Sequence, residues 1–126
     1  MTPQEAFDDA WPWLASALSA YGPTHDKVHV IEALESGKAQ FWYHPEAAVI
    51  TEIKVWPTGF REVVGWLAGG SLAGILTLIP QIETWARSIG CERAIINGRY
   101  GWKRRLPPGY VVHGSTFAKD LAHGAE

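Results

Sequence analysis

Residues 60–90, FREVVGWLAGGSLAGILTLIPQIETWARSIG, decide the fold of this chain. The first part, Phe60–Ala68, has the two-residue hydrophobic period of a strand. After the pair Gly69-Gly70, apolar residues recur every three or four positions up to Gly90, which predicts one long helix with a kink or a late start at Pro80. The apolar face of this helix comprises Leu72, Ile75, Leu76, Ile79, Ile82, Ala86 and Ile89.

Two further strands precede this segment, at residues 39–43 and 47–56, where the hydrophobic period is also two. The linkers His44-Pro45-Glu46 and Pro57-Thr58-Gly59 are short and consist largely of residues that favour turns. Turns of this length join antiparallel neighbours, so the three strands are expected to form a meander.

The N-terminal part of the chain carries two helical patterns. Residues 3–21 have an apolar stripe with Thr2 as the cap, and Pro12 inside this pattern predicts a kink or two shorter helices. The second pattern spans residues 24–36, with its first residue as the cap and Gly37 as the stop. The side chains of this helix that we expect to face the core are Val28, Ile31 and Leu34.

Three shorter elements follow the long helix: a strand at Arg93–Asn97, a helical turn at Gly101–Leu106 and a last strand at Gly109–Phe117. A meander followed by a crossover helix predicts an α/β or α+β domain with one mixed sheet. The 126 residues suffice for a single domain, with an N-terminal helical segment at 1–23 and a core at 24–121.

The composition excludes several classes of protein. Hydrophobic residues make up 47% of the chain and charged residues 19%, which is typical of a packed domain and not of a disordered chain. The single cysteine, Cys91, excludes an internal disulfide and a cysteine-based zinc site. His25, His29 and Glu32 share one helix face, but no fourth ligand lies near them in the sequence, so we assign no metal.

The sequence indicates neither secretion nor membrane insertion. Residues 1–9 contain three acidic residues and no basic one, unlike a signal peptide, so we expect a cytoplasmic location. The twenty uncharged residues 63–82 are long enough to span a bilayer. Their glycines, serine and proline fit a strand, a turn and a buried helix as well, and we therefore expect no membrane association.

Charge is distributed unevenly along the chain. Residues 1–52 hold eight acidic and two basic side chains, whereas residues 53–126 hold five acidic and nine basic ones. Six of the basic residues lie in segment 87–105, which contains one acidic residue and is called the basic segment below. Such a surplus attracts phosphates, nucleic acid or an acidic protein surface, and it is equally compatible with an ordinary solvated surface.

Two stretches and one carboxylate are candidates for function. The junction Gly69-Gly70-Ser71 leads into a helix whose first N–H groups can bind phosphate, although a tight turn explains the glycines equally well. The run at 97–106, NGRYGWKRRL, places aromatic and cationic side chains after a strand end, where α/β sheets bind ligands. The same mixture suits single-stranded nucleic acid. Glu52, in mid-strand, is either a general base or a partner in a cross-strand ion pair.

The element order and several short motifs resemble the GNAT acyltransferase fold without its first strand. The segment WARSIGC at 85–91 is similar to the end of the family's long helix, Arg93–Asn97 to its next strand, and TFAKDL at 116–121 to its closing segment. The run GRYGW at 98–102 and the stretch from Gly37 to Phe41-Trp42 are similar to small GNAT-like proteins of phages and prophages, which include internal head-assembly proteins of podophages. The resemblance covers the core.

The resemblance implies a coenzyme A site in a gap between two parallel strands. The family's pyrophosphate loop corresponds to the stretch around the glycine pair, which lacks the family's leading Gln or Arg. We expect the glycine pair to open the gap. The residues implied in coenzyme binding are Ala68, Gly69, Gly70, Ser71, Asn97, Arg99 and Arg104.

The resemblance also implies the position of the catalytic groups. The family's proton-donating tyrosine lies seven residues after an asparagine, and counting from Asn97 this position is Arg104. An arginine cannot act as a general acid near neutral pH. If the chain is an enzyme, Tyr100 is the candidate general acid and Glu52 the candidate general base through water.

Three hypotheses about function result. The first is a phage- or prophage-type GNAT-like protein, in the cytoplasm or the virion, that binds an assembly protein through the basic segment and performs no acetyl transfer. The second is an acetyl-CoA-dependent N-acetyltransferase. The third and least favoured is a single-stranded nucleic-acid binder.

Overall fold

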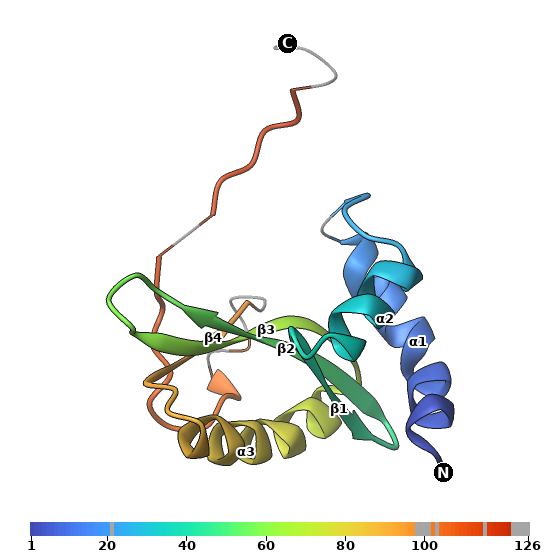
Figure 1. The fold of residues 1–126 in the computed structure, drawn as a ribbon, viewed down its shortest axis with the longest axis horizontal. Coiled ribbons are helices and arrows are strands. Elements are labelled where there is room, and N and C mark those ends of the chain that lie inside the picture. The colour runs from blue at the N-terminus through green and yellow to red at the C-terminus, as the bar shows by residue number, and fades with distance from the viewer. Residues whose placement is uncertain (21, 98–101, 103, 115, 122–126) are drawn as a thin grey trace.

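A computed structural model describes residues 1–20, 22–97, 102, 104–114 and 116–121. The helices are α1 (Pro3–Ser19), α2 (Lys27–Glu35) and α3 (Leu72–Ser88), and the strands are β1 (Ala39–His44), β2 (Ala47–Val55), β3 (Arg61–Gly70) and β4 (Arg93–Ile96). The sheet order is β1-β2-β3-β4, with the first three strands antiparallel and β4 parallel to β3. The predicted α/β domain with a mixed sheet, a meander and a crossover helix is confirmed (Figure 1).

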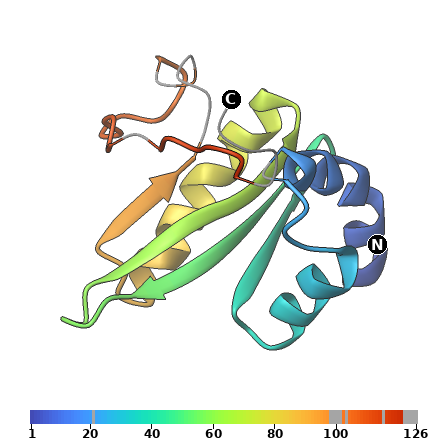
Figure 2. The ribbon, with the colours of Figure 1, turned by 90° about the horizontal axis from the view of Figure 1, so that it is seen from above.

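The helices cover the two faces of the sheet (Figure 2). Helices α1 and α2 cover one face, and α3 covers the other. The core under α1 and α2 contains Phe7, Ala10, Leu14, Leu18, Val30, Ala39, Ala48, Ile50 and Leu67. The core under α3 contains Ala47, Val49, Val63, Ile75, Leu78, Ile79, Ile82 and Ala86.

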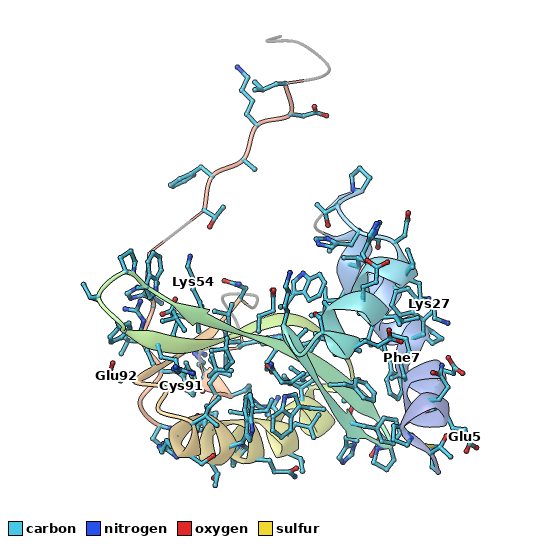
Figure 3. The ribbon with its side chains drawn as sticks, in the orientation of Figure 1. Glu5, Phe7, Lys27, Lys54, Cys91 and Glu92 are labelled. Atoms are coloured by element: carbon cyan, nitrogen blue, oxygen red, sulfur yellow. The ribbon has the colours of Figure 1, made fainter. Side chains whose placement is uncertain are left out.

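A cation fixes the contact between α1 and α2. Lys27 Nζ lies 5.9 Å from the ring centroid of Phe7 and 5.5 Å from that of Trp11, and 3.6 Å from Asp8 Oδ1. Figure 3 shows Phe7 and Lys27 at this contact. Because the first residue of α2 is held to the first half of α1, the two helices cover the sheet together.

Both prolines that interrupt the helical patterns lie inside continuous helices. Helix α1 runs through Pro12 as one element, and α3 begins at Leu72 and runs through Pro80. Two shorter N-terminal helices and a late start of α3 are therefore incorrect. Both prolines are exposed, so water can bond the carbonyl groups that lack a partner because proline has no N–H.

Helix α2 is shorter than its hydrophobic pattern. It begins at Lys27 with Asp26 as its N-cap, so Thr24 is not the cap. Aspartate is a stronger N-cap than threonine, which explains the later start. Val28 is 53% exposed, contrary to expectation, and Val30 is the residue of this helix that is fully buried.

The chain after β4 differs from the prediction. Leu106 N–H donates to the Trp102 carbonyl over 3.0 Å, which confirms a helical turn in the described part of 101–106. The described residues of 109–117 form no strand, so the last predicted strand is wrong. Val111 and Phe117 are 78% and 92% exposed, and Figure 1 shows this segment leading away from the body. An alternating pattern forms a strand only where a sheet edge can accept its hydrogen bonds.

The uncharged stretch 63–82 is divided between β3 and α3. Among the described residues, no helix combines the length and the apolar content that crossing a bilayer requires.

An ion pair between a buried carboxylate and a partly exposed arginine joins β3 to β4 where the parallel pairing begins. Arg93 Nε donates to Glu62 Oε2 over 2.7 Å, and Trp56 Nε1 donates to Glu62 Oε1 over 3.0 Å. Burial raises the pKa of the Glu62 carboxyl, but the hydrogen bonds from Arg93 and Trp56 and the nearby positive charges outweigh it, so the pKa lies below its usual value. The ionised form of Glu62 therefore stabilises the fold.

We predict that this ion pair makes the protein sensitive to acid. Because the pKa of Glu62 is lower in the folded than in the unfolded chain, its stabilising effect is present above the ordinary value of 4.5 and is lost as the pH falls through the lowered value. Glu62→Gln is expected to cost about 1–2 kcal/mol of unfolding free energy at pH 7. It should also make the unfolding free energy decrease less steeply as the pH falls. Urea denaturation between pH 3 and 7 measures both, with exposed Glu92→Gln as the control. An equal decrease of unfolding free energy toward low pH in Glu62→Gln and Glu92→Gln would contradict the role given to the Glu62 carboxylate.

Helix α1 approaches β3 closely at Gly69. A Cβ atom built on this glycine lies 2.5 Å from the carbonyl oxygen of Trp13, which is backbone and cannot rotate away. A Cβ atom on Gly65, in the same strand, finds its nearest neighbour, Ile95 O, at an ordinary 3.7 Å. The glycine at 69 therefore sets the distance between α1 and the sheet.

We predict that Gly69→Ala destabilises the fold by about 1–3 kcal/mol, because α1 has to move away from β3. Gly65→Ala serves as the matched control and is expected to change the unfolding free energy by less than about 0.5 kcal/mol. Thermal and urea denaturation measure the difference. Equal unfolding free energies for Gly69→Ala and Gly65→Ala would show that α1 can move away from Gly69 at no measurable cost.

Candidate active site

The parallel strands β3 and β4 pair over a short distance and then separate. Their register runs from Glu62↔Arg93 to Gly65↔Ile96, where β4 ends. Strand β3 continues for five more residues, to Gly70, with β2 as its partner on one side only. Within the described residues, the edge of β3 that faces β4 is therefore without a strand partner beyond Gly65.

A β-bulge lies at the point of separation. The register between β2 and β3 shifts from Ile50↔Leu67 to Thr51↔Gly65, which leaves Trp66 as an extra residue in β3. Both Trp66 and Leu67 pack with the core under α1 and α2, as expected when two successive side chains of a bulged strand share a face. The gap therefore begins at Trp66.

The glycine pair does not open this gap, contrary to our expectation. Gly69 and Gly70 are the last residues of β3 and pair with Ala48 and Ala47. The bulge, three residues earlier in the chain, redirects the strand because an extra residue on one side bends the ladder. Gly70 is required for a different reason: its φ is 95°, which other residues rarely adopt.

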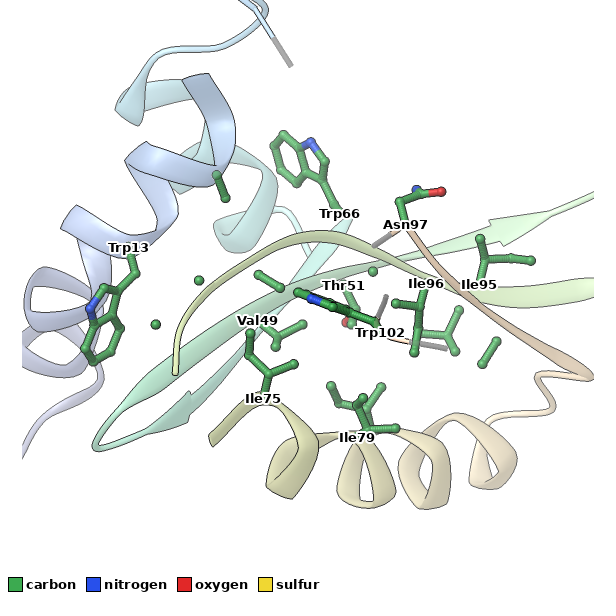
Figure 4. A pocket seen from close by; sticks show the side chains of 18 of the residues that line it. Trp13, Val49, Thr51, Trp66, Ile75, Ile79, Ile95, Ile96, Asn97 and Trp102 are labelled. Carbon is green, nitrogen blue, oxygen red and sulfur yellow. The ribbon is translucent and has the colours of Figure 1, made fainter. Parts of the chain in front are cut away.

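A pocket of about 1010 Å³ occupies the gap and extends to both faces of the sheet. Its lining on the α1 side includes Trp13, Ser16, Ala17, Ala20 and Trp66. On the α3 side the lining includes Val49, Thr51, Val63, Ile75, Ile79 and Ile82. The end of β4 and the following turn contribute Ile96, Asn97 and Trp102 (Figure 4). The pocket is therefore lined by residues from both faces of the sheet.

The N-terminus of α3 lies beside the pocket. Ser71 is the N-cap: its Oγ accepts from Gly74 N–H over 3.0 Å, and its own N–H donates to Glu46 O over 2.7 Å. Within the described residues, the N–H groups of Leu72 and Ala73 have no hydrogen-bond acceptor. Free N–H groups at a helix N-terminus attract an anion such as phosphate.

The structure brings part of the predicted coenzyme site together. Ala68, Gly69, Gly70 and Asn97 line the pocket, and Ser71 caps the adjoining helix. Arg104 is exposed on the helical turn that begins at Trp102, outside the lining. Arg99 and Tyr100 lie outside the described residues.

Glu52 lies apart from the pocket lining. It pairs with Ala39 and Val64 in the sheet, and strand alternation places it on the face of Ile50, which is covered by α1 and α2. Its neighbour Thr51 reaches the pocket on the opposite face. Glu52 is not among the described residues that line the pocket. It could therefore exchange a proton with a ligand in the pocket only through an intervening water.

A hydroxyl–carboxylate pair in the pocket was not predicted from the sequence. Tyr110 Oη donates to Glu83 Oε2 over 2.6 Å, and both residues line the pocket. Burial, with the hydrogen bond to Glu83 and its charge, raises the pKa of Tyr110 well above its usual value of 10.0. The two residues are 27 positions apart, and no local pattern links them.

Aromatic rings surround the α1 side of the pocket. The Trp66 ring lies 4.9 Å from the His25 ring in an edge-on arrangement, and Trp13 lines the same side. His25 precedes α2, so the connection between α1 and α2 lies next to this entrance. Among the described residues, no group of three or more His, Cys, Asp or Glu side chains could hold a metal ion.

Comparison with known proteins identifies the fold. The sequence matches no protein-family model and no curated protein sequence. The structure is similar to a ribosomal-protein-alanine N-acetyltransferase from Brucella melitensis biovar Abortus 2308, with a TM-score of 0.61, 17% identity, and coverage of 96% of this chain and 95% of that one. It is also similar to an aminoglycoside acetyltransferase from an uncultured soil metagenomic sample, solved with sisomicin, with a TM-score of 0.63, 10% identity and 88% coverage of both chains.

A third similar structure is an aminoglycoside 6'-N-acetyltransferase from Acinetobacter haemolyticus, with a TM-score of 0.56, 15% identity, and coverage of 95% of this chain and 96% of that one. At these identities the likeness concerns the fold. The chain thus has the GNAT-like acetyltransferase fold, as a single α/β domain with a mixed four-stranded sheet. None of these comparisons indicates a phage or prophage relationship.

We predict that the Tyr110–Glu83 pair stabilises the segment that closes the α3 side of the pocket. Tyr110→Phe is expected to cost about 1.5 kcal/mol of unfolding free energy, because the partly buried carboxylate loses its donor. Tyr43→Phe is the matched control: its hydroxyl donates to Asp9 over the same 2.6 Å, but at an exposed position, where the loss should be smaller. Denaturation of both variants at pH 7 compares them. An equal or larger loss of unfolding free energy for Tyr43→Phe would show that burial does not strengthen the Tyr110–Glu83 hydrogen bond.

Proposed function

We propose that this protein is an acyl-CoA-dependent N-acyltransferase, with acetyl-CoA as the simplest donor and a primary amine as the acceptor. The observation that carries the proposal is the pocket that crosses the sheet where β3 and β4 separate. A group-transfer reaction requires two reactants to meet in line, and one pocket lined from both faces of the sheet can hold both of them. The fold, shared with acetyltransferases of low identity, agrees with this chemistry.

The coenzyme enters on the side of the α3 N-terminus in this proposal. The free N–H groups of Leu72 and Ala73 hold its pyrophosphate, next to Gly70 and Ser71. Arg99 and Arg104, in the basic segment, add positive charge for the phosphates. The pantetheine arm then follows the free edge of β3 past Ala68 and Asn97.

The reaction proceeds by direct attack of the amine nitrogen on the thioester carbonyl carbon. A C–N bond forms, the C–S bond breaks, and the oxygen carries negative charge in between. N–H groups on the edge of β3 beyond Gly65 can stabilise this oxygen, because no strand among the described residues accepts from them. The amine proton passes through water to Glu52, and the leaving thiolate takes a proton from Tyr100.

The acceptor enters from the α1 side. Trp13 and Trp66 offer aromatic faces there, and aromatic faces bind cationic amines before they are deprotonated. The similar structures are named as an aminoglycoside acetyltransferase and a ribosomal-protein-alanine N-acetyltransferase, and an amine acceptor agrees with both names.

Two other functions are compatible with the same fold. In a phage-type assembly protein, the pocket has no catalytic role. Arg104 then stands at the position of the family's proton-donating tyrosine because the protein performs no acetyl transfer. In a single-stranded nucleic-acid binder, the basic segment and Trp102 contact the strand. Neither function requires coenzyme A, so a test of coenzyme binding separates both from the enzyme.

We predict that acetyl-CoA stabilises the protein against heat. At a ligand concentration one hundred times the dissociation constant, the gain is about 2.7 kcal/mol. Arg104→Ala is expected to weaken binding about fivefold, from the loss of ~1 kcal/mol of phosphate attraction, whereas exposed Arg105→Ala, on the same turn, changes it less. Thermal-shift titration with acetyl-CoA and with free CoA measures both effects.

The outcome decides among the three functions. No shift at millimolar acetyl-CoA and CoA would reject the enzyme. Binding of an oligonucleotide that weakens steeply with salt would then favour the nucleic-acid binder. If coenzyme binds, release of free thiol in the presence of amine acceptors tests transfer directly.

A further inference from the structure

The chain after Tyr110 exposes large apolar side chains. Residues 111–121 are called the C-terminal segment, and all of them except 115 are described. Within this segment Val111 is 78%, Phe117 92% and Leu121 79% exposed. Figure 1 shows the segment leading away from the body of the protein. Single exposed apolar residues are common, but three of this exposure within one short segment indicate a contact surface.

These side chains have the spacing of one face of a strand. Steps of two residues lead from Val111 to Phe117 and Leu121, so in an extended strand the three side chains point the same way. Thr116, next to Phe117, then belongs to the opposite face, and it is exposed as well. The described residues from 111 to 120 form neither a helix nor a strand. The segment therefore has the pattern of a strand but lacks a strand partner within the described part of its own chain.

Strand β4 has an edge to which such a strand could be added. It is the last strand of the sheet and pairs with β3 on one side only. Among the described residues, no backbone hydrogen bond joins its other edge to the C-terminal segment. All four residues of β4 are partly exposed. The outer N–H and C=O groups of an edge strand can pair with a strand from another chain.

The C-terminal segment begins close to this edge. Tyr110, the residue before it, is held to α3 by its hydrogen bond to Glu83. Val111 lines an opening of about 410 Å³ together with Ala94 and other residues of β4. The other edge of the sheet is β1, on the far side of β2 and β3. Of the two edges, β4 is therefore the one that lies where the segment leaves the body.

A second copy of the chain is the partner that satisfies both open features. In a two-fold arrangement each copy gives one apolar strand and receives another at its edge. A different protein bound at β4 would leave the apolar side chains of the segment exposed. The segment is long enough for exchange, because its residues in extended conformation span up to roughly 36 Å, whereas neighbouring strands lie about 4.8 Å apart.

We propose that two copies of this chain form a dimer by exchanging C-terminal segments, so that residues 111–121 of each copy pair with the outer edge of β4 of the other. Val111, Phe117 and Leu121 then cover one face of the partner's sheet at this edge. The mixed sheet of each copy gains a strand that its own chain does not supply.

Sedimentation velocity over a range of protein concentrations tests the dimer. The full chain should sediment as a dimer that dissociates on dilution. Phe117→Asp is expected to raise the dissociation constant at least about a hundredfold, because two buried rings are lost per dimer. Since Phe117 is 92% exposed in the single chain, its replacement should leave thermal unfolding of the monomer unchanged. Thr116→Asp, the matched control, adds the same charge on the opposite face and should change the dissociation constant less than about threefold.

Hydrogen exchange locates the edge that receives the segment. Peptides covering 93–96 should exchange more slowly in the dimer than in Phe117→Asp at the same concentration, because the partner's strand accepts from the outer N–H groups of β4. Peptides covering 39–44, in β1, are the internal control and should not change. Leu121→Asp, which alters the same face as Phe117→Asp, repeats both measurements.

Three results would overturn the proposal. A monomer at all concentrations would exclude exchange. A dimer that persists in Phe117→Asp and Leu121→Asp would place the contact elsewhere. A dimer that is lost in these variants without a change of exchange at 93–96 would show that the segments pair with each other and not with β4. Coenzyme binding is measured separately, so the dimer and the proposed function can fail independently.

Discussion

The parting of β3 and β4 at Gly65 is the constraint on which the rest of the site depends. Parallel strands normally continue to pair, because unpaired N–H and C=O groups cost free energy when they are buried. Here the extra residue Trp66 bends β3, and the short β4 stops, so the pocket takes the place of a ladder. The ion pair between buried Glu62 and partly exposed Arg93 holds the other end of the two strands together, which makes the parting a fork with a fixed base.

Helices on both sides support this fork. Helix α1 lies against the last residues of β3, and the glycine at 69 allows the two backbones to approach. Helix α3 begins directly after β3 and returns beneath the sheet, so its N-terminal N–H groups lie beside the gap and its apolar face lies below it. The strand, its bulge and the helix after it therefore place an anion-binding end and an apolar wall at one pocket.

Several features of the fold follow from local physics and were predicted. The two-residue period over β1 to β3 and the short turns between them require an antiparallel meander, and the long helical period after Gly70 requires a crossover to a parallel strand. The errors arose where local signals compete with tertiary contacts. Pro12 and Pro80 remain in continuous helices because they face solvent, and the apolar alternation at 109–117 joins no edge in the described structure. Among the residues that line the pocket, those near the glycine pair were candidates from the sequence, whereas Tyr110 and Glu83 were not.

The sequence by itself determined the order of the elements, the class of the sheet and the part of the chain beside which the pocket lies, because periodicity and turn chemistry act over a few residues. Only the tertiary structure decided what opens that site. A bulge depends on the register between β2 and β3, and register is a property of two strands that neither encodes alone. For the same reason only the folded chain shows that Glu52 and Thr51, neighbours in the sequence, lie on opposite faces, and that aliphatic side chains from β2, β3 and α3 line one pocket.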